Sequence, residues 1–244
     1  MQVTYHPEKT RSFRDLGWIK LYQSFNPSHP PAPNRAHFGA LIIFDNGHIM
    51  PGGKGFGMHP HDNMEIVSVV VHGAMVHSDT AGHNGVNVEN AIQLISAGTG
   101  IQHSEYNQSS TEEIDNLQIW FLPKRKNIAP RYQTMVSSPD DRAGKLQLLV
   151  SPTAEDKSLE INQDVWMWRG SFGAGSSMNF VKKLHDSGIY LYVISGKAIG
   201  LNQELNYRDG VGIVDTESVF ISFEEPTDLL IIEVPMHRIE IDSF

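Results

Sequence analysis

The chain has 244 residues, of which 40% are hydrophobic and 19% charged, and its formal net charge at pH 7 is −9. This composition is that of a globular protein, and it excludes a wholly disordered chain and a coiled coil. The acidic balance argues against a protein that binds nucleic acid through the phosphate backbone, and the absence of cysteine excludes disulfide scaffolds, iron–sulfur clusters and thiol nucleophiles.

The sequence has no apolar core of a signal peptide near its start and no stretch of 18 apolar residues. We therefore expect a cytoplasmic protein that has no contact with a membrane. The short basic run at 124–126 is interpreted as a solvated turn, because runs of like charge usually lie in solvent.

Short strands are the main predicted elements. Residues 1–36 are mixed and rich in turn-forming residues, and the prolines at 27, 30, 31 and 33 predict that no regular element crosses 27–33. Further along, β-branched and aromatic runs separated by Gly, Asn, Asp and Pro predict strands at 37–44, 64–72, 91–95, 116–122, 146–150, 164–169, 188–195, 211–214, 217–223 and 228–234. Residues 138–144 allow at most one helical turn. The pattern indicates an all-β sandwich or barrel.

A weak internal repeat predicts two halves. The segment IVSVVVHGAMV (66–76) is similar to IYLYVISGKAI (189–199), and Gly73 and Gly196 align at an offset of 123. We expect each glycine to form the tight turn of a hairpin, since glycine tolerates a positive φ. Turn-forming residues between 123 and 145 mark the boundary, which gives an N-terminal domain, 1–135, and a C-terminal domain, 136–244.

Histidines cluster in the first half, where eight of the twelve lie between His37 and His103. His59 and His61 are one residue apart, so on an extended strand both side chains point to the same face. His103 and Glu105 repeat this spacing, and two antiparallel strands could bring these four side chains to one point. Imidazole and carboxylate ligands suit Fe, Ni, Zn, Mn or Cu. A single His-x-His is usually an ordinary surface or core feature; the second pair is what favours a metal site.

Other side chains near this cluster have simpler interpretations. We interpret His72 and His77 as strand or turn residues and not as ligands. We expect Phe56, Met58 and Phe121 to line the metal pocket, because of their places in the sequence relative to the motifs that carry the histidines.

The motifs that carry these residues resemble those of a known family. The pattern Gly53-x5-His59-x-His61-x3-Glu65 resembles the first cupin motif, and Gly100-x2-His103-x3-Asn107 resembles the second. The stretches HPHDNMEIV, HSDTAGHNG and SAGTGIQHSEYN are similar to those of the pirin family, and NLQIWFLPKRKNIAPRYQ is similar to the segment that follows in its bacterial members. The resemblance is dense from about 38 to 133 and thinner over the second half.

The resemblance implies an all-β bicupin, with two β-barrel halves packed face to face and one metal in the N-terminal half. The implied ligands are His59, His61, His103 and Glu105. Glu65, a ligand position in many cupins, then becomes a residue beside the ligands, and we keep it as an alternative ligand.

The sequence departs from the family pattern at two places. The arginine expected after His-Pro-His is Asp62, and the Pro-Gly-Asp turn expected before SAGTG is Val88-Glu89-Asn90. Asparagine suits turns, so we expect the fold to survive. At an offset of 123, His59 and His61 align with Lys182 and Leu184, so the second half is expected to bind no metal.

The activity implied by the resemblance is that of a metal-dependent dioxygenase, which opens the ring of a flavonol-like aromatic substrate with dioxygen. Glu105 would act as general base, and Fe(II) is the implied metal, with Ni, Mn, Cu and Zn as alternatives. We expect a monomer or a weak oligomer that does not bind nucleic acid. The main alternative function is a non-catalytic, metal-binding regulator or redox sensor that acts through protein partners; a storage or stress protein without turnover is a third.

Overall fold

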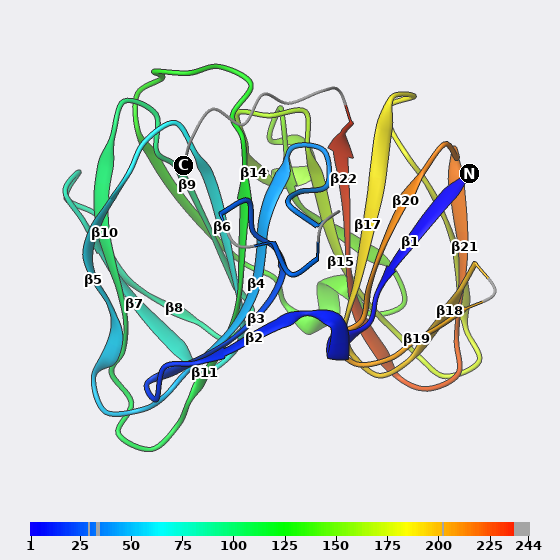
Figure 1. Ribbon diagram of the computed structural model, residues 1–244, viewed down its shortest axis with the longest axis horizontal. Helices are drawn as coiled ribbons and strands as arrows, with labels where there is room; N and C mark the ends of the chain where they lie inside the picture. The colour runs from blue at the N-terminus through cyan, green and yellow to red at the C-terminus, as the bar shows by residue number, and fades with distance from the viewer. Residues whose placement is uncertain (29, 33–34, 202, 237–244) are drawn as a thin grey trace.

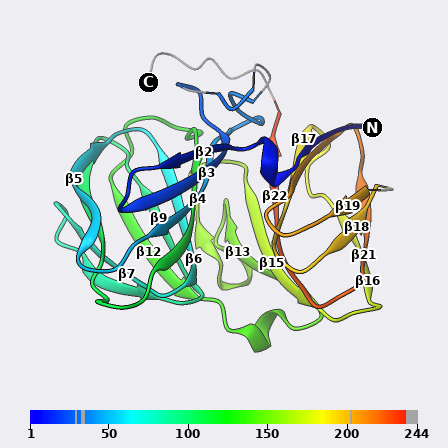
Figure 2. The same ribbon diagram turned by 60° about the horizontal axis from the view of Figure 1, so that its bottom comes forward.

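The computed structural model describes residues 1–28, 30–32, 35–201 and 203–236. Within these residues the chain forms 22 strands in four sheets, together with 3-10 turns at Glu8–Thr10, Pro139–Arg142 and Glu155–Lys157 (Figures 1 and 2). The all-β prediction is confirmed, and every predicted strand segment overlaps an observed strand. None of the described helices is long and apolar enough to cross a membrane.

The first half contains two sheets. The first large sheet has the order β12 (Arg131–Val136), β9 (Ala91–Ser96), β6 (Glu65–His72), β11 (Ile114–Phe121), β4 (Leu41–Ile49), β3 (Ile19–Phe25) and β2 (Ser12–Asp15). The first small sheet has the order β5 (Lys54–His61), β10 (Ile101–Asn107), β7 (Ala74–Asp79) and β8 (Asn84–Val88). These two sheets enclose the interior of the first half, which is on the left in Figure 1.

The second half repeats this arrangement. The second large sheet has the order β1 (Gln2–His6), β20 (Gly210–Val214), β17 (Ser187–Ser195), β22 (Thr227–Pro235), β15 (Trp166–Phe172), β13 (Leu146–Ser151) and β14 (Leu159–Glu160). The second small sheet has the order β16 (Ser177–Val181), β21 (Ser218–Phe223), β18 (Ala198–Gly200) and β19 (Gln203–Leu205).

The N-terminal strand joins the second half. Strand β1 runs antiparallel to β20, with Gln2 opposite Val214 and His6 opposite Gly210 (Figure 1). The sequence analysis predicted no strand before residue 37 and so missed β1, β2 and β3, whereas residues 27, 28 and 30–32 lie outside every strand, as their prolines predict. The partner of β1 is about 200 residues away in the sequence, so no local pattern could indicate the pairing. The division of the chain at 135/136 stays a prediction.

Gly73 and Gly196 lie at equivalent places in the two halves, where the chain passes from a large sheet to a small sheet, and neither forms a hairpin turn. Strands β6 and β17 lie in large sheets, whereas β7 and β18, which follow these glycines, lie in small sheets, so the hairpin prediction is wrong. The backbone φ is +81° at Gly73 and +79° at Gly196. A Cβ atom would lie 2.7 Å from the carbonyl oxygen of Glu113 at the first corner and 2.1 Å from that of Pro226 at the second. Both corners therefore require glycine, for its positive φ and for the close approach of another backbone.

The turn between β8 and β9 accommodates the altered sequence. Asn90 adopts a φ of +66°, which asparagine tolerates better than most residues. Its backbone N–H donates to the carbonyl of Val70, and its side-chain oxygen accepts a hydrogen bond from Arg142 at 2.9 Å. The expectation that the fold survives this departure is thus met at this turn.

The largest apolar core lies between the two large sheets. On β11, Leu117, Ile119 and Phe121 belong to this core, together with Tyr190 and Ile232 of the second half. The intervening side chains of β11 face the interior of the first half, since neighbouring residues of a strand point to opposite faces. Packing of the two large sheets thus joins the halves face to face, as expected for a bicupin.

Candidate metal centre

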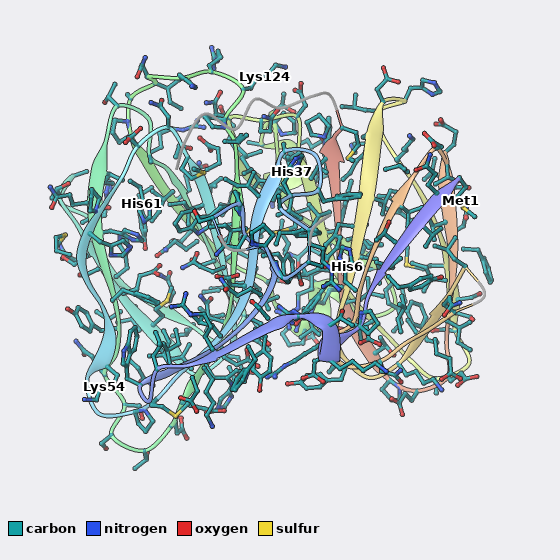
Figure 3. All side chains as sticks on the ribbon, in the orientation of Figure 1. Met1, His6, His37, Lys54, His61 and Lys124 are labelled. Atoms are coloured by element: carbon teal, nitrogen blue, oxygen red, sulfur yellow. The ribbon has the colours of Figure 1, made fainter. Side chains whose placement is uncertain are left out.

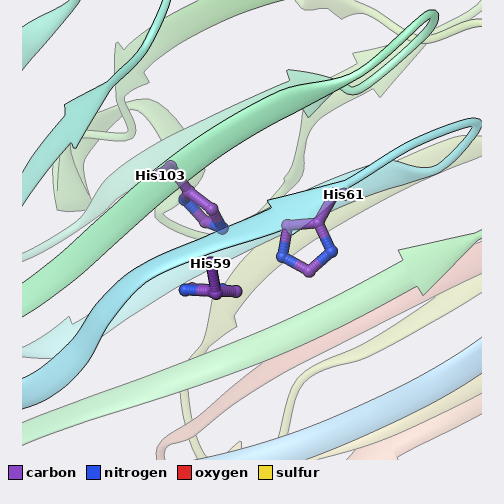
Figure 4. Close-up of side chains that lie close together, drawn as sticks. All are labelled: His59, His61 and His103. Carbon is purple, nitrogen blue, oxygen red and sulfur yellow. The ribbon is translucent and has the colours of Figure 1, made fainter.

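Strands β5 and β10 bring three histidines together. In their antiparallel register His103 lies opposite His59, and Ile101 lies opposite His61. The ring centroids are 4.5 Å apart for His59 and His103, 4.8 Å for His59 and His61, and 4.9 Å for His61 and His103. One ring nitrogen from each histidine lies within 4.8 Å of the other two (Figure 4). The convergence of these histidines, predicted from their spacing, is thus present in the fold.

Nitrogen atoms of this cluster remain free to bind a metal. His59 Nδ1 is 2.7 Å from the carbonyl oxygen of Gly57, so it carries the proton, and the lone pair is on Nε2. His61 Nε2 and both ring nitrogens of His103 are buried and have no hydrogen-bond partner among the described residues. Leaving buried polar atoms unpaired costs free energy, so their presence fits a site that is completed by an ion.

The protonation state of the cluster also suits a metal. Burial, together with the neighbouring imidazole of His59, lowers the pKa of His61 to about 4 and that of His103 to about 3. Both rings are therefore neutral at pH 7, and a neutral imidazole is the form that binds a metal.

Glu105 lies beside this cluster, held by two amides. Its Oε1 accepts a hydrogen bond from Gln93 Nε2 at 2.8 Å, and its Oε2 accepts one from Gln118 Nε2 at 2.8 Å. Burial raises the pKa of Glu105. A Glu105 carboxylate oxygen forms a second close group with nitrogens of His103 and His77, all within 4.8 Å of one another. The coordination of a metal by Glu105 stays a prediction.

His77 is closer to the centre than the sequence suggested. It lies on β7 opposite Glu105, and its Nε2 is 3.1 Å from Asp79 Oδ2. Its Nδ1 is buried without a hydrogen-bond partner in the described part of the chain, and its ring stacks on Tyr132 at 4.4 Å. The expectation that His77 is a strand or turn residue is met, and the fold in addition places one of its ring nitrogens beside His103 and Glu105.

The three histidines line a largely apolar pocket between the two sheets of the first half. Its walls include Phe56 and Trp120, and the remaining apolar residues are Ile19, Leu21, Ile43, Ile49 and Ile66. The ring of Trp120 meets His61 edge-on at 4.8 Å. Phe56 is a pocket residue as expected, but the predictions for Met58 and Phe121 are wrong: Met58 is 51% exposed, and Phe121 is buried between the large sheets.

Glu65 faces away from the histidines. It shares its face of β6 with Val67, which belongs to the core between the halves. Its Oε2 accepts hydrogen bonds from Ser96 Oγ at 2.7 Å and from the backbone N–H of Asn162 at 3.2 Å. This placement argues against Glu65 as an alternative ligand and gives it a role in joining the halves.

The second half has no equivalent site among its described residues. Lys182 aligns with His59, and its buried ammonium donates to the carbonyls of His185 and Ser187. The interior between the second large and small sheets is filled by aromatic and aliphatic side chains, among them Trp168 and Phe180. The volume that forms a pocket in the first half is thus occupied here by a packed core.

The sequence analysis missed three polar residues of the site. Gln93 and Gln118 each stand between two apolar residues of a strand, and Asp45 directly follows the apolar run 41–44, which is the signal that could have identified them. A polar side chain at such a position must find a buried partner, because an unpaired one is costly.

Family models match both halves of the chain. The model described as Pirin matches residues 6–121, and the model described as Quercetinase C-terminal cupin domain matches residues 148–234.

Proteins and structures of high similarity support these matches. The quercetin 2,3-dioxygenase of Escherichia coli (strain K12) is 32% identical over 225 residues, covering 92% of this chain and 95% of that protein. A pirin-like protein of Caulobacter vibrioides is 34% identical over 90% of this chain and 94% of that protein. The crystal structure of the bacterial pirin YhhW from Escherichia coli in complex with nickel(II) has a TM-score of 0.90 and 29% identity, covering 96% of this chain and 99% of that one.

Proposed function

The chain belongs to the pirin family, and from this premise we propose that it is a metal-dependent dioxygenase that opens the ring of a flavonol-like aromatic substrate. The observation that carries the proposal is the set of three converging imidazoles, His103 buried and His59 and His61 half-buried, on the wall of an apolar pocket. Such a pocket suits a flat aromatic ligand, and the name of the Escherichia coli relative gives its chemical class.

One divalent transition metal per chain would be held by His59, His61, His103 and Glu105. Imidazole and carboxylate donors suit several such metals, so the donor set does not select one. Nickel(II) is the ion in the YhhW complex, and Fe(II) is our expectation for this chain. When bound, the metal supplies Lewis-acid chemistry that lowers the pKa of a substrate hydroxyl and orients it.

The side chains of the pocket provide the remaining functions. A Glu105 carboxylate oxygen accepts the proton of the substrate hydroxyl, and the amides of Gln93 and Gln118 hold that carboxylate in place. Apolar walls exclude water, and Trp120 offers a flat surface beside His61. In the overall reaction both atoms of dioxygen are consumed; the opened ring leaves as an ester and one carbon leaves as carbon monoxide.

The alternative is a metal-binding protein without turnover that acts as a regulator or redox sensor through protein partners. It predicts the same metal site, so only a measurement of turnover separates the two. The cytoplasmic location, the monomeric or weakly associated state and the lack of nucleic-acid binding stay predictions.

Oxygen uptake and carbon monoxide release with quercetin test the proposal. Protein prepared without metal is loaded separately with Fe(II) and Ni(II), and turnover is measured for each. We expect uptake for at least one metal, and its loss in His61→Ala with an unchanged far-ultraviolet circular dichroism spectrum. Absence of uptake for every loaded metal, with the metal content verified, would favour the regulatory function.

A further inference from the structure

A row of polar side chains crosses the inner face of the first large sheet. Its members lie at one register on five neighbouring strands, in the order Gln23, Asp45, Gln118, Ser68 and Gln93. Residues directly opposite one another on paired strands point to the same face, so the row faces the interior of the first half. Two of its members, Gln93 and Gln118, bind Glu105, whereas Asp45 contributes a carboxylate that the metal centre does not use.

Asp45 has acceptor capacity left for a ligand. Its two oxygens accept hydrogen bonds from one donor, Gln23 Nε2, at 3.2 and 3.0 Å. Ser12 Oγ donates to the other end of the Gln23 amide at 3.3 Å, which fixes its orientation. In the described part of the chain no lysine or arginine forms an ion pair with Asp45. A carboxylate offers about four acceptor positions, so the two hydrogen bonds from Gln23 leave about two of them free for a ligand.

Asn116 supplies a second acceptor on the same wall. Its side-chain oxygen is buried and has no hydrogen-bond partner in the described chain, and the residue lines the pocket. It lies opposite Gly47, two positions from Asp45, so the two side chains are diagonal neighbours on one face. The wall around them is formed by Leu21, Ile43 and Ile49. Acceptors in an apolar wall favour a ligand that supplies hydrogen-bond donors, because a buried acceptor without a donor costs free energy.

We propose that Asp45, assisted by Asn116, binds hydroxyl groups of the ligand on the wall that faces His59, His61 and His103, and so selects polyhydroxylated aromatic ligands. The inference rests on the proposed function in that the ligand reaches the histidines through this pocket. Burial raises the pKa of Asp45 to about 7, as expected for a buried carboxyl that has no direct ion pair among the described residues.

Calorimetric titration with two flavonols tests the assignment. Quercetin and 3-hydroxyflavone share the hydroxyl and carbonyl that would meet the metal, but 3-hydroxyflavone has no other hydroxyl. Both are titrated into nickel-loaded protein under nitrogen, for the unmodified chain, Asp45→Leu, Asp45→Asn and the control Glu217→Gln. Glu217 is an exposed carboxylate of the second half, and its side chain pairs with His185.

We expect the unmodified chain and Glu217→Gln to bind quercetin at least tenfold more tightly than 3-hydroxyflavone. In Asp45→Leu this preference falls to within about twofold, because only the quercetin affinity drops. Asp45→Asn keeps the side-chain shape and loses the charge, and we expect it to reduce the preference for quercetin by a factor of about five. This variant tests the role of Asp45 if Asp45→Leu does not fold.

Equal affinities in the unmodified chain, no binding of either flavonol, or an equal loss for both in the Asp45 variants would overturn the assignment. If the unmodified chain binds quercetin selectively but no loaded metal supports oxygen uptake, the dioxygenase function is contradicted while the assignment of Asp45 stands. If oxygen uptake is observed and the Asp45 variants keep the full preference for quercetin, the assignment of Asp45 fails while the dioxygenase function stands.

Discussion

Glu105 and Gln118 are joined by a 2.8 Å hydrogen bond that spans the interior of the first half. Glu105 lies on β10 of the first small sheet, and Gln118 lies on β11 of the first large sheet. A second amide, that of Gln93, reaches Glu105 from the same large sheet. The large sheet, which packs against the second half, therefore also orients the carboxylate beside the three histidines (His61, labelled in Figure 3, marks their place in the first half).

Replacing Gln118 by leucine should shift the pH dependence of metal binding. The hydrogen bond from Gln118 favours the charged form of Glu105, so its loss raises further a pKa that burial already raises. Protons then compete with the metal at a higher pH. The pH at which half of the bound nickel is released should increase in Gln118→Leu. Gln102→Leu is the control, since Gln102 is an exposed residue of the same strand as Glu105; an equal shift in both variants would contradict this role for Gln118.

Removing His61 or His103 should abolish tight metal binding and leave the β fold intact. The strands are stabilised by apolar burial in the cores between the sheets, which these histidines do not supply. We expect metal affinity to fall by at least about a hundredfold in His61→Ala and His103→Ala, more than the 10–100-fold typical of residues that only orient a ligand. Elemental analysis and circular dichroism measure the two effects. His72→Ala, which alters a half-exposed histidine paired with Glu89, should retain its metal; unfolding of the metal-free variants would mean that the site is structural.

The variant Glu105→Gln should keep part of its metal and lose turnover. An amide oxygen can still act as a weak ligand and can still accept a hydrogen bond, but it cannot take up the hydroxyl proton. Metal content and oxygen uptake, measured on the same preparation, separate the two properties. Full activity in this variant would exclude Glu105 as the base.

Glu65→Gln should stabilise the protein at alkaline pH. Burial raises the pKa of Glu65 from 4.5 to about 7, so between these values the folded chain holds a proton that the unfolded chain has released. Stability from this residue is thus present below pH 4.5 and is lost as pH rises to 7. The glutamine variant stays neutral, so its advantage in free energy of unfolding should grow from about 1 kcal/mol at pH 5 to roughly 3 kcal/mol at pH 8.

Urea denaturation at the two pH values measures this change. Asp45, whose pKa burial also raises to about 7, contributes equally to both proteins and cancels in the comparison. A constant difference between the variant and the unmodified chain would show that Glu65 is ionised at the interface throughout.

A fragment that ends near residue 135 should aggregate, although it retains every proposed ligand. The large sheets share one apolar core, so loss of the second half exposes side chains such as Leu117 and Ile119, and strand β1 loses its partner β20. Light scattering and gel filtration follow the aggregation. Elemental analysis of the full chain should find about one metal per molecule. A soluble, metal-binding fragment, or two tightly bound metals per chain, would contradict the packing role of the second half.

The sequence by itself determined the fold class and the location of the histidine cluster proposed as a metal centre. Alternation of apolar and polar residues sets which face of a strand is buried, and the His-x-His spacing of 59 and 61 sets two imidazoles on one face whatever the strand packs against. These are local properties with a period of two residues, so they are visible in a single segment. The resemblance of the motifs to the pirin family added the pairing of the two halves.

Only the tertiary structure decided which side chains meet across strands and sheets. Glu65 and Ile66 are neighbours in sequence, yet Glu65 faces Asn162 of the second half while Ile66 lines the pocket, because the strand has two faces and local sequence does not say which is the pocket side. The pairing of β1 with β20 and the row that contains Asp45 depend on the register of strands that are far apart in the chain. Register is set by the packing of whole sheets, and for this reason the polar side of the pocket emerged only when the fold was known.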